Sequence, residues 1–146
     1  MCLYVADKIH PNRRSGIPLV AKQPILVWKR LDNCNDTHGY SPYRGTRWDY
    51  GKEKTVHRFT YGGGARRRDY RLVEGGLHAF TSVTAIRIPS GGNICPAVIP
   101  VGARFWLGCY DEIVSDKMTV YRTVPDLFTA LGITKFAKPI RKADLT

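Results

Sequence analysis

Near its N-terminal end the chain reads Pro24-Ile25-Leu26-Val27-Trp28-Lys29-Arg30-Leu31. This stretch is rich in β-branched and aromatic side chains, and it lies between Pro24 and a polar cluster at residues 32–36, which predicts a strand. It is far shorter than the roughly 18 apolar residues that cross a bilayer, and it contains Lys29 and Arg30. We therefore expect the central strand of a sheet, and no membrane partner.

Short extended segments follow this strand. Residues 46–50 and 55–61 alternate polar with aromatic or aliphatic side chains, and the turn residues at 50–53 predict that the two segments form a hairpin. Further strands, separated by Gly, Pro or Asp, are expected at 70–74, 77–80, 94–101, 103–107, 112–114 and 118–122. Strands of this length and spacing are typical of an antiparallel sheet.

Two segments carry the signals of short helices. Thr81 or Ser82 supplies a cap for a helix at 83–86, although β-branched residues there lower the helix propensity. Near the C-terminus Pro125 begins a segment at 127–131 that a glycine follows, which predicts a second helix.

The length of 146 residues fits one domain, and the chain shows no internal repeat or long linker. We predict a single α+β domain, 1–146, built mainly on antiparallel sheet with one or two short helices. Outside the core we expect an irregular arm at 7–22, where Gly and Pro interrupt every periodicity, and a basic C-terminal tail at 135–146.

The charge is strongly positive and unevenly distributed. Lys and Arg number 23 against 12 Asp and Glu, which gives +11. Residues 1–71 hold 15 basic and 6 acidic residues (15 − 6 = +9), whereas the remainder holds 8 and 6 (8 − 6 = +2). Such an excess favours polyanionic partners or anionic ligands.

The basic half interleaves cations with aromatic rings. Guanidinium groups pair with phosphates and rings stack on bases, so this pattern predicts binding of a nucleic acid or nucleotide. The alternative interpretation buries Trp48, Phe59 and Tyr61 in the core and leaves the arginines as a solvated face. The candidate anion-binding residues are Arg44, Arg47, Arg58, Arg66, Arg67, Arg68 and Arg71, and the candidate stacking residues are Trp48, Tyr50 and Tyr61.

Cys2 follows an initiator methionine that cells commonly remove before a small residue. The new α-amino group, with a pKa of ~7.7 to 8, can act as a base for the Cys2 thiol, which is how N-terminal nucleophile enzymes begin. The alternative is an edge strand at 3–5, in which Cys2 is a small hydrophobic residue.

Arg44, Ser82 and Glu112 occur in an order that resembles the arginine, serine and glutamate positions of arginine-type ADP-ribosyltransferases. In those enzymes the arginine contacts the dinucleotide phosphates and the glutamate stabilises the ribosyl transition state. The resemblance therefore implies a catalytic role for Glu112. Tyr110 stands where these enzymes have a second acid or a glutamine. The alternative makes Arg44 a turn residue, Ser82 a helix cap and Glu112 a hairpin charge.

The cysteines carry no clear metal pattern. Cys34 and His38 have a metal-like spacing, but no second Cys or His pair follows at the distance of a zinc finger. We expect no metal or other cofactor. A core of this size needs no disulfide, and the N-terminus lacks a secretory pattern, so we expect reduced thiols in the cytoplasm.

The order of several motifs resembles a family of small proteins found in phages and gut bacteria. The motifs are MCL at 1–3, ILVWKRL at 25–31, SPYRG at 41–45, GLHAFTS at 76–82, IPVG at 99–102 and IVSDK at 113–117. The resemblance implies a phage or mobile-element origin, action in the cytoplasm of a host cell, and binding of host factors or signalling nucleotides.

These observations favour a non-enzymatic binding module whose basic face, from Arg44 to Arg71, holds a phosphate-bearing partner. Two other hypotheses stay open. One is an enzyme that uses Cys2, or that is an active or degenerate ADP-ribosyltransferase. The other is an inhibitor that docks an acidic host protein on the same basic face. The sequence leaves the oligomeric state open.

Overall fold

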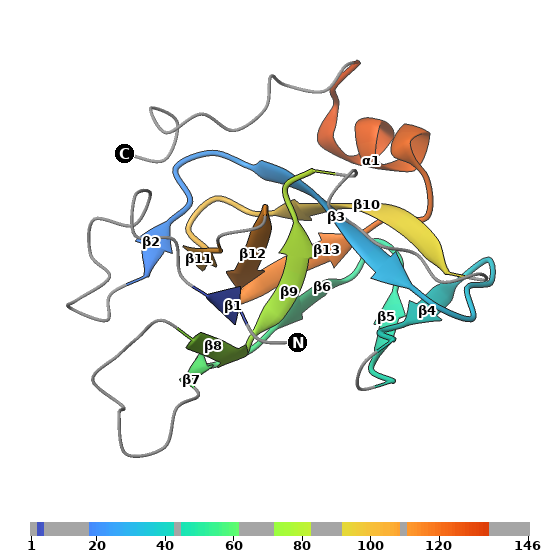
Figure 1. The fold of residues 1–146 in the computed structure, drawn as a ribbon. Coiled ribbons are helices and arrows are strands. Elements are labelled where there is room, and N and C mark those ends of the chain that lie inside the picture. The colour runs from blue at the N-terminus through green and yellow to red at the C-terminus, as the bar shows by residue number, and fades with distance from the viewer. Residues whose placement is uncertain are drawn as a thin grey trace.

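The computed structural model describes residues 3–4, 18–42, 45–61, 72–82, 92–108 and 111–134. These residues form a series of short strands and the helix α1, Val124–Leu131 (Figure 1). The strands are, in chain order, β1 (Leu3–Tyr4), β2 (Leu19–Val20), β3 (Ile25–Leu31), β4 (His38–Tyr40), β5 (Arg47–Asp49), β6 (Glu53–Thr55), β7 (Thr60–Tyr61), β8 (Leu72–Gly75), β9 (Leu77–Phe80), β10 (Asn93–Ile99), β11 (Arg104–Leu107), β12 (Glu112–Ser115) and β13 (Lys117–Val120).

Eight of these strands form one antiparallel sheet in the order β2-β11-β12-β9-β3-β10-β13-β6. Asp116 alone separates β12 from β13 along the chain, yet β9, β3 and β10 lie between them in the sheet. One residue spans only about 3.5 Å. The sheet must therefore curl until the segment 112–120 joins its two sides, which makes an open barrel.

The inner face of the barrel is the main core. Strand β3 alternates buried with half-buried residues, and its inward positions are Ile25, Val27, Lys29 and Leu31. Because side chains alternate between the faces of a strand, a lysine shares the inner face with three aliphatic residues. The largest fully buried side chains of the core include Phe105, Ile99, Ile113 and Met118.

A smaller cluster lies on the outer face of β11 and β12. Trp106 and Val114 pair across these two strands, and they pack with Phe59 and with Val73 of β8. Strands β1, β8 and β7 form a separate sheet of three strands beside this cluster. The expected edge strand at 3–5 corresponds to β1, which lies at one side of that sheet.

Asp116 holds the bend between β12 and β13. Its carboxylate accepts hydrogen bonds from the backbone N–H and the Nε of Arg104, both at 2.9 Å. Its backbone donates to the Arg104 carbonyl at 3.0 Å and accepts from the Val56 N–H at 2.8 Å. The residue thus ties β11 and the end of β6 to the strand that closes the barrel.

The expectation of one small domain built mainly on antiparallel strands is confirmed. The described part is mainly β with one helix, so the predicted α+β class overestimates the helix content. The C-terminal helix is confirmed: Thr123 Oγ1 accepts from the Asp126 N–H at 3.2 Å, Gly132 ends the helix at φ 66°, and Leu127 is buried. The helix expected at 83–86 lies outside the described residues.

The hairpin expected between 46–50 and 55–61 is wrong. Strand β5 pairs with β4, β6 pairs with β13, and β7 pairs with β8. The turn after β5 exists, with Gly51 at φ 75°. However, the Gly51 N–H donates to the Val120 carbonyl at 2.8 Å, which directs the chain toward β13.

The end of the arm expected at 7–22 forms the short strand β2, which pairs with β11 at the side of the sheet. Residues 7–17 and the tail at 135–146 lie outside the described residues. Within the ranges given above, no helix is long and apolar enough to cross a membrane.

Gly76 tests the packing of the smaller cluster, which contains Phe59 and Val114. Its φ is 149°, and a Cβ there would overlap Val114 Cγ1 and lie 3.0 Å from Phe59 Cδ1. We expect Gly76→Ala to lower the free energy of unfolding by about 3 kcal/mol, through backbone strain and overpacking. Urea denaturation followed by tryptophan fluorescence measures this loss.

Gly102→Ala is the matched control, because Gly102 also has a positive φ, 86°, but no atom lies within 4 Å of its Cβ position. Backbone strain alone should lower its free energy of unfolding by about 1 kcal/mol. Equal losses in the two variants would contradict the packing argument.

Candidate anion-binding site

Hairpin β4–β5 brings Trp48 against the barrel. Gly39 lies opposite Trp48 in the hairpin register. A Cβ on Gly39 would lie 2.8 Å from Cys34 Sγ and 3.0 Å from Leu31 Cβ, so glycine permits this close approach. Trp48 is only 3% exposed, and its indole N–H donates to Ser41 Oγ at 2.8 Å. The ring therefore belongs to the main core.

Two lysines point their ammonium groups at this one ring. The Nζ of Lys29 lies 4.8 Å from the ring centroid of Trp48, and the Nζ of Lys54 lies 5.0 Å from it. Lys29 comes from the inner face of β3 and Lys54 from β6. At these distances the negative face of an indole attracts a cation. Trp48 thus gathers two positive charges from strands far apart in the sequence.

Lys29 is buried, and no acidic side chain among the described residues pairs with it. Its Nζ donates to the His78 carbonyl at 2.6 Å, and the residue is 8% exposed. Burial, and then the charge of Lys54, lower the pKa of Lys29 from 10.5 to about 8. Among the described residues no carboxylate raises this pKa. A buried charge without a partner is costly, so this position favours an anion nearby.

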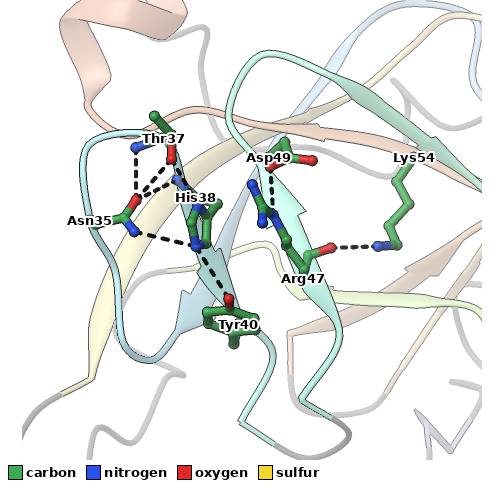
Figure 2. A network of polar contacts seen from close by, with 7 residues as sticks. All are labelled: Asn35, Thr37, His38, Tyr40, Arg47, Asp49 and Lys54. Carbon is green, nitrogen blue, oxygen red and sulfur yellow. Dashed lines mark hydrogen bonds and ion pairs between the residues drawn. The ribbon is translucent and has the colours of Figure 1, made fainter.

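Lys54 and Arg47 meet at the outer end of the site (Figure 2). The Nζ of Lys54 donates to the Arg47 carbonyl at 2.6 Å, and Arg47 Nε donates to Asp49 Oδ1 at 2.9 Å. Burial lowers the pKa of Lys54, and Asp49 partly offsets this effect. The hydrogen bond from Arg47 lowers the pKa of Asp49, so the acid is already engaged. Positive charge remains in excess around Trp48.

His78 lies beside this excess of positive charge and is itself neutral near pH 7. Burial first, and then the charge of Lys29, lower the pKa of His78 to about 4. Its Nδ1 lies 3.2 Å from the Gly76 carbonyl, which identifies Nδ1 as the protonated nitrogen. The interior thus accepts the Lys29 cation but excludes a second one at His78.

His38 belongs to a closed polar network at the start of the hairpin (Figure 2). Its Nδ1 lies 2.7 Å from Thr37 Oγ1, and its Nε2 lies 3.3 Å from Asn35 Nδ2 and 3.2 Å from the Tyr40 hydroxyl. Since the Asn35 amide is a donor, Nε2 accepts and Nδ1 carries the proton. No three His, Cys, Asp or Glu side chains within the described ranges could together hold a metal ion.

The structure brings together part of the predicted site. Arg47 and Trp48 lie at its centre, and Arg58 is exposed in the connection from β6 to β7. Trp48 and Phe59 are buried, as the alternative interpretation expected, and little of the Trp48 ring is left for a base. Tyr50 packs against the main core, and its hydroxyl is buried. Tyr61 lies in β7.

The other predicted residues lie outside the described ranges: Cys2, Arg44, Arg66, Arg67, Arg68 and Arg71. The candidate residues named from the sequence do not include Lys29 or Lys54, although Lys54 lies within the predicted basic face from Arg44 to Arg71. The signal for Lys29 was its position in the strand. It lies an even number of residues from Ile25, Val27 and Leu31, so its side chain is on the same, buried face.

The structure also brings Glu112 beside the Thr81–Ser82 step. Glu112 pairs with Phe80 across β12 and β9, and the Thr81 N–H donates to the Asp111 carbonyl at 2.7 Å. Burial raises the pKa of Glu112. Two of the three positions of the transferase-like pattern are therefore neighbours in space.

The unopposed charge of Lys29 predicts a specific dependence of stability on pH. The folded chain releases this proton near pH 8 and the unfolded chain near 10.5, so the free energy of unfolding should rise with pH between these values. The rise should reach about 3 kcal/mol at most. Lys29→Met should remove it, as urea titrations at a series of pH values would measure.

Lys22→Met provides the control, because Lys22 is an exposed lysine after β2 and should leave the rise intact. A rise of the same size in the Lys29→Met protein would place the titrating group elsewhere.

Comparison with models of protein families, with curated proteins and with solved structures finds no match for this chain.

Proposed function

We propose that this protein is a non-enzymatic binding module that holds a phosphate-bearing partner, a nucleic acid or a nucleotide, at hairpin β4–β5 and strand β6. The observation that carries the proposal is the pair of ammonium groups on Trp48. No carboxylate in the described part of the chain raises the pKa of the buried Lys29. A phosphate beside the two ammonium groups would offset charges that repel one another.

Exposed cations extend this surface. Arg47, Lys52 and Arg58 are all exposed within residues 45–61. Arg47 offers a guanidinium whose Nε is bound to Asp49, so its terminal nitrogens remain for a phosphate. The net charge of +11 supports a polyanion over a small neutral ligand.

Arg44, Arg66, Arg67, Arg68 and Arg71 complete the proposed surface on the basis of sequence. They flank residues 45–61 on both sides in the chain. An acidic host protein is the competing occupant. Because electrostatic attraction to the basic face is the same for both partners, a pull-down separates the two.

Binding of a fluorescent single-stranded oligonucleotide, followed by anisotropy over a range of salt concentrations, tests the proposal. We expect Lys54→Gln to weaken binding and to lower the slope of log K against log salt by about 0.7, the value for one lost phosphate contact. Reversal of Arg66, Arg67 and Arg68 to Glu should lower the slope further. An unchanged slope in the triple variant would remove those three residues from the surface.

Lys22→Gln is the matched control. It removes the same charge from an exposed lysine in the connection from β2 to β3. Equal weakening by Lys22→Gln and Lys54→Gln would mean that net charge alone drives binding. Absence of binding to any oligonucleotide or nucleotide, with capture of an acidic protein instead, would overturn the proposal.

A second measurement reports on Lys29 directly. An anion beside Lys29 raises its pKa from about 8, so binding at pH 8 should take up protons. The uptake should reach up to about half a proton per site. Calorimetric titrations in two buffers of different ionisation enthalpy measure it, and Lys29→Met should abolish it.

The position of Glu112 beside Thr81 and Ser82 supports a second candidate, an ADP-ribosyltransferase-like enzyme. Such an enzyme would release nicotinamide from its dinucleotide substrate, and chromatography of the reaction mixture would detect it. We expect Glu112→Gln to abolish that release, since a neutral side chain stabilises a ribosyl cation poorly. Activity that persists in Glu112→Gln would exclude this site.

A further inference from the structure

Two free cysteines come together behind hairpin β4–β5. Cys34 lies in the connection from β3 to β4, and Cys95 lies on β10, the neighbour of β3 in the barrel. Cys95 is 2% exposed and belongs to the main core, against which Cys34 also packs. Two segments far apart in the sequence thus each contribute a thiol to the same end of the core.

The Cys34 sulfur packs against the backbone of β4. A Cβ on Gly39 would lie 2.8 Å from Cys34 Sγ, which shows that the sulfur fills the space beneath the backbone of β4. Cys34 is half-buried, so reagents in solution reach it more easily than Cys95.

The two thiols and one phenol influence one another. Burial first, and then the neighbouring Cys34, raise the pKa of the Cys95 thiol to about 12. Burial, Cys34 and Cys95 together raise the pKa of Tyr50. The buried Tyr50 hydroxyl has no hydrogen-bond partner among the described residues. Within the described ranges, no carboxylate or histidine joins this group to complete a metal site.

We propose that Cys34 and Cys95 are a redox-sensitive modification site, at which a peroxide converts the two thiols into a reversible disulfide. Cys34 Sγ and Leu31 Cβ lie 2.8 and 3.0 Å from the Cβ position of Gly39, and Cys95 lies diagonally from Leu31 in the β3–β10 register, which places both thiols in one corner of the core. A bond of about 2.05 Å requires the two side chains to turn toward one another. This inference does not rest on the proposed binding function.

The chemistry balances with hydrogen peroxide as the oxidant. The Cys34 sulfur attacks one peroxide oxygen, the O–O bond breaks, and Cys34 becomes a sulfenic acid while one water is released. The Cys95 sulfur then attacks the Cys34 sulfur, the S–O bond breaks, and the Cys95 proton leaves with the hydroxide as a second water. Cys34 reacts first because it is the more exposed, and Cys95 remains a protonated thiol until then.

The disulfide would anchor the hairpin to the barrel. Cys34 immediately precedes β4, whose partner β5 carries Arg47 and Trp48. A bond from Cys34 to β10 would restrict the movement of this hairpin relative to the sheet. Oxidation would therefore slow amide exchange in β4 and β5 more than in β11 or β12.

The test treats the full chain with hydrogen peroxide, alkylates the remaining thiols, and maps peptides by mass spectrometry without reduction. We expect a cross-linked peptide that joins Cys34 to Cys95, lighter than its two parts by two hydrogen atoms, and we expect dithiothreitol to restore both thiols. Cys34→Ser should abolish the cross-link. Because Cys34 is half-buried, this variant should remain folded even if Cys95→Ser does not.

Cys2→Ser and Cys109→Ser are the matched controls, and each should retain the cross-link. Two outcomes would overturn the proposal. One is oxidation of Cys34 to sulfinic acid while Cys95 stays a thiol, which would show that Cys95 does not reach it. The other is a cross-link to Cys2 or Cys109 in place of Cys95.

Discussion

The carboxylate of Asp116 is the contact on which the rest of the barrel depends. It lies at the single residue between β12 and β13, where one continuous segment passes from one side of the sheet to the other. Its two oxygens hold the backbone and side chain of Arg104, and Arg104 Nη2 reaches onward to the His57 carbonyl at 3.2 Å. A buried acid whose hydrogen bonds are satisfied by a neighbouring strand fixes the angle of the bend. The order of the other strands follows from that closure.

Closure of the barrel explains how the charged side chain of Lys29 comes to be buried. Closure places the inner face of β3 beneath hairpin β4–β5, and Trp48 then covers the end of the core. The cost of burying the Lys29 ammonium group is lowered by one carbonyl at 2.6 Å and by the indole ring, but no acid of residues 18–42, 45–61, 72–82, 92–108 or 111–134 neutralises it. The buried polar side chains of the described residues are Lys29, Ser115, Asp116 and Thr119, and Lys29 lies beside the surface where exposed cations gather. The buried charge of Lys29 in the core thus lies next to the exposed cations of the surface.

Local sequence patterns were enough for much of the fold but for less of the site. The strand at 24–31, the helix after Pro125 and most later strands followed from residue types and turn signals, which act over a few positions. The strand partners did not follow from such local signals. Residues 50–53 specify a chain reversal, but the hydrogen bond from Gly51 to Val120, which directs the chain toward β13, joins residues far apart in the sequence. Arg47 and Trp48 were recognised from their side chains. Lys54 was not, because its role arises only when β6 pairs with β13 and brings it to Trp48.

The two strands that end the sheet order have a further consequence. Within the described residues, β2 has 2 residues and β6 has 3, and the latter carries Glu53 and Lys54. A strand at the side of a sheet presents unpaired backbone groups that can template the addition of another chain. Here those groups are few and flanked by charge, so a second molecule gains little by extending the sheet. The open barrel therefore resists edge-to-edge aggregation without having to close completely.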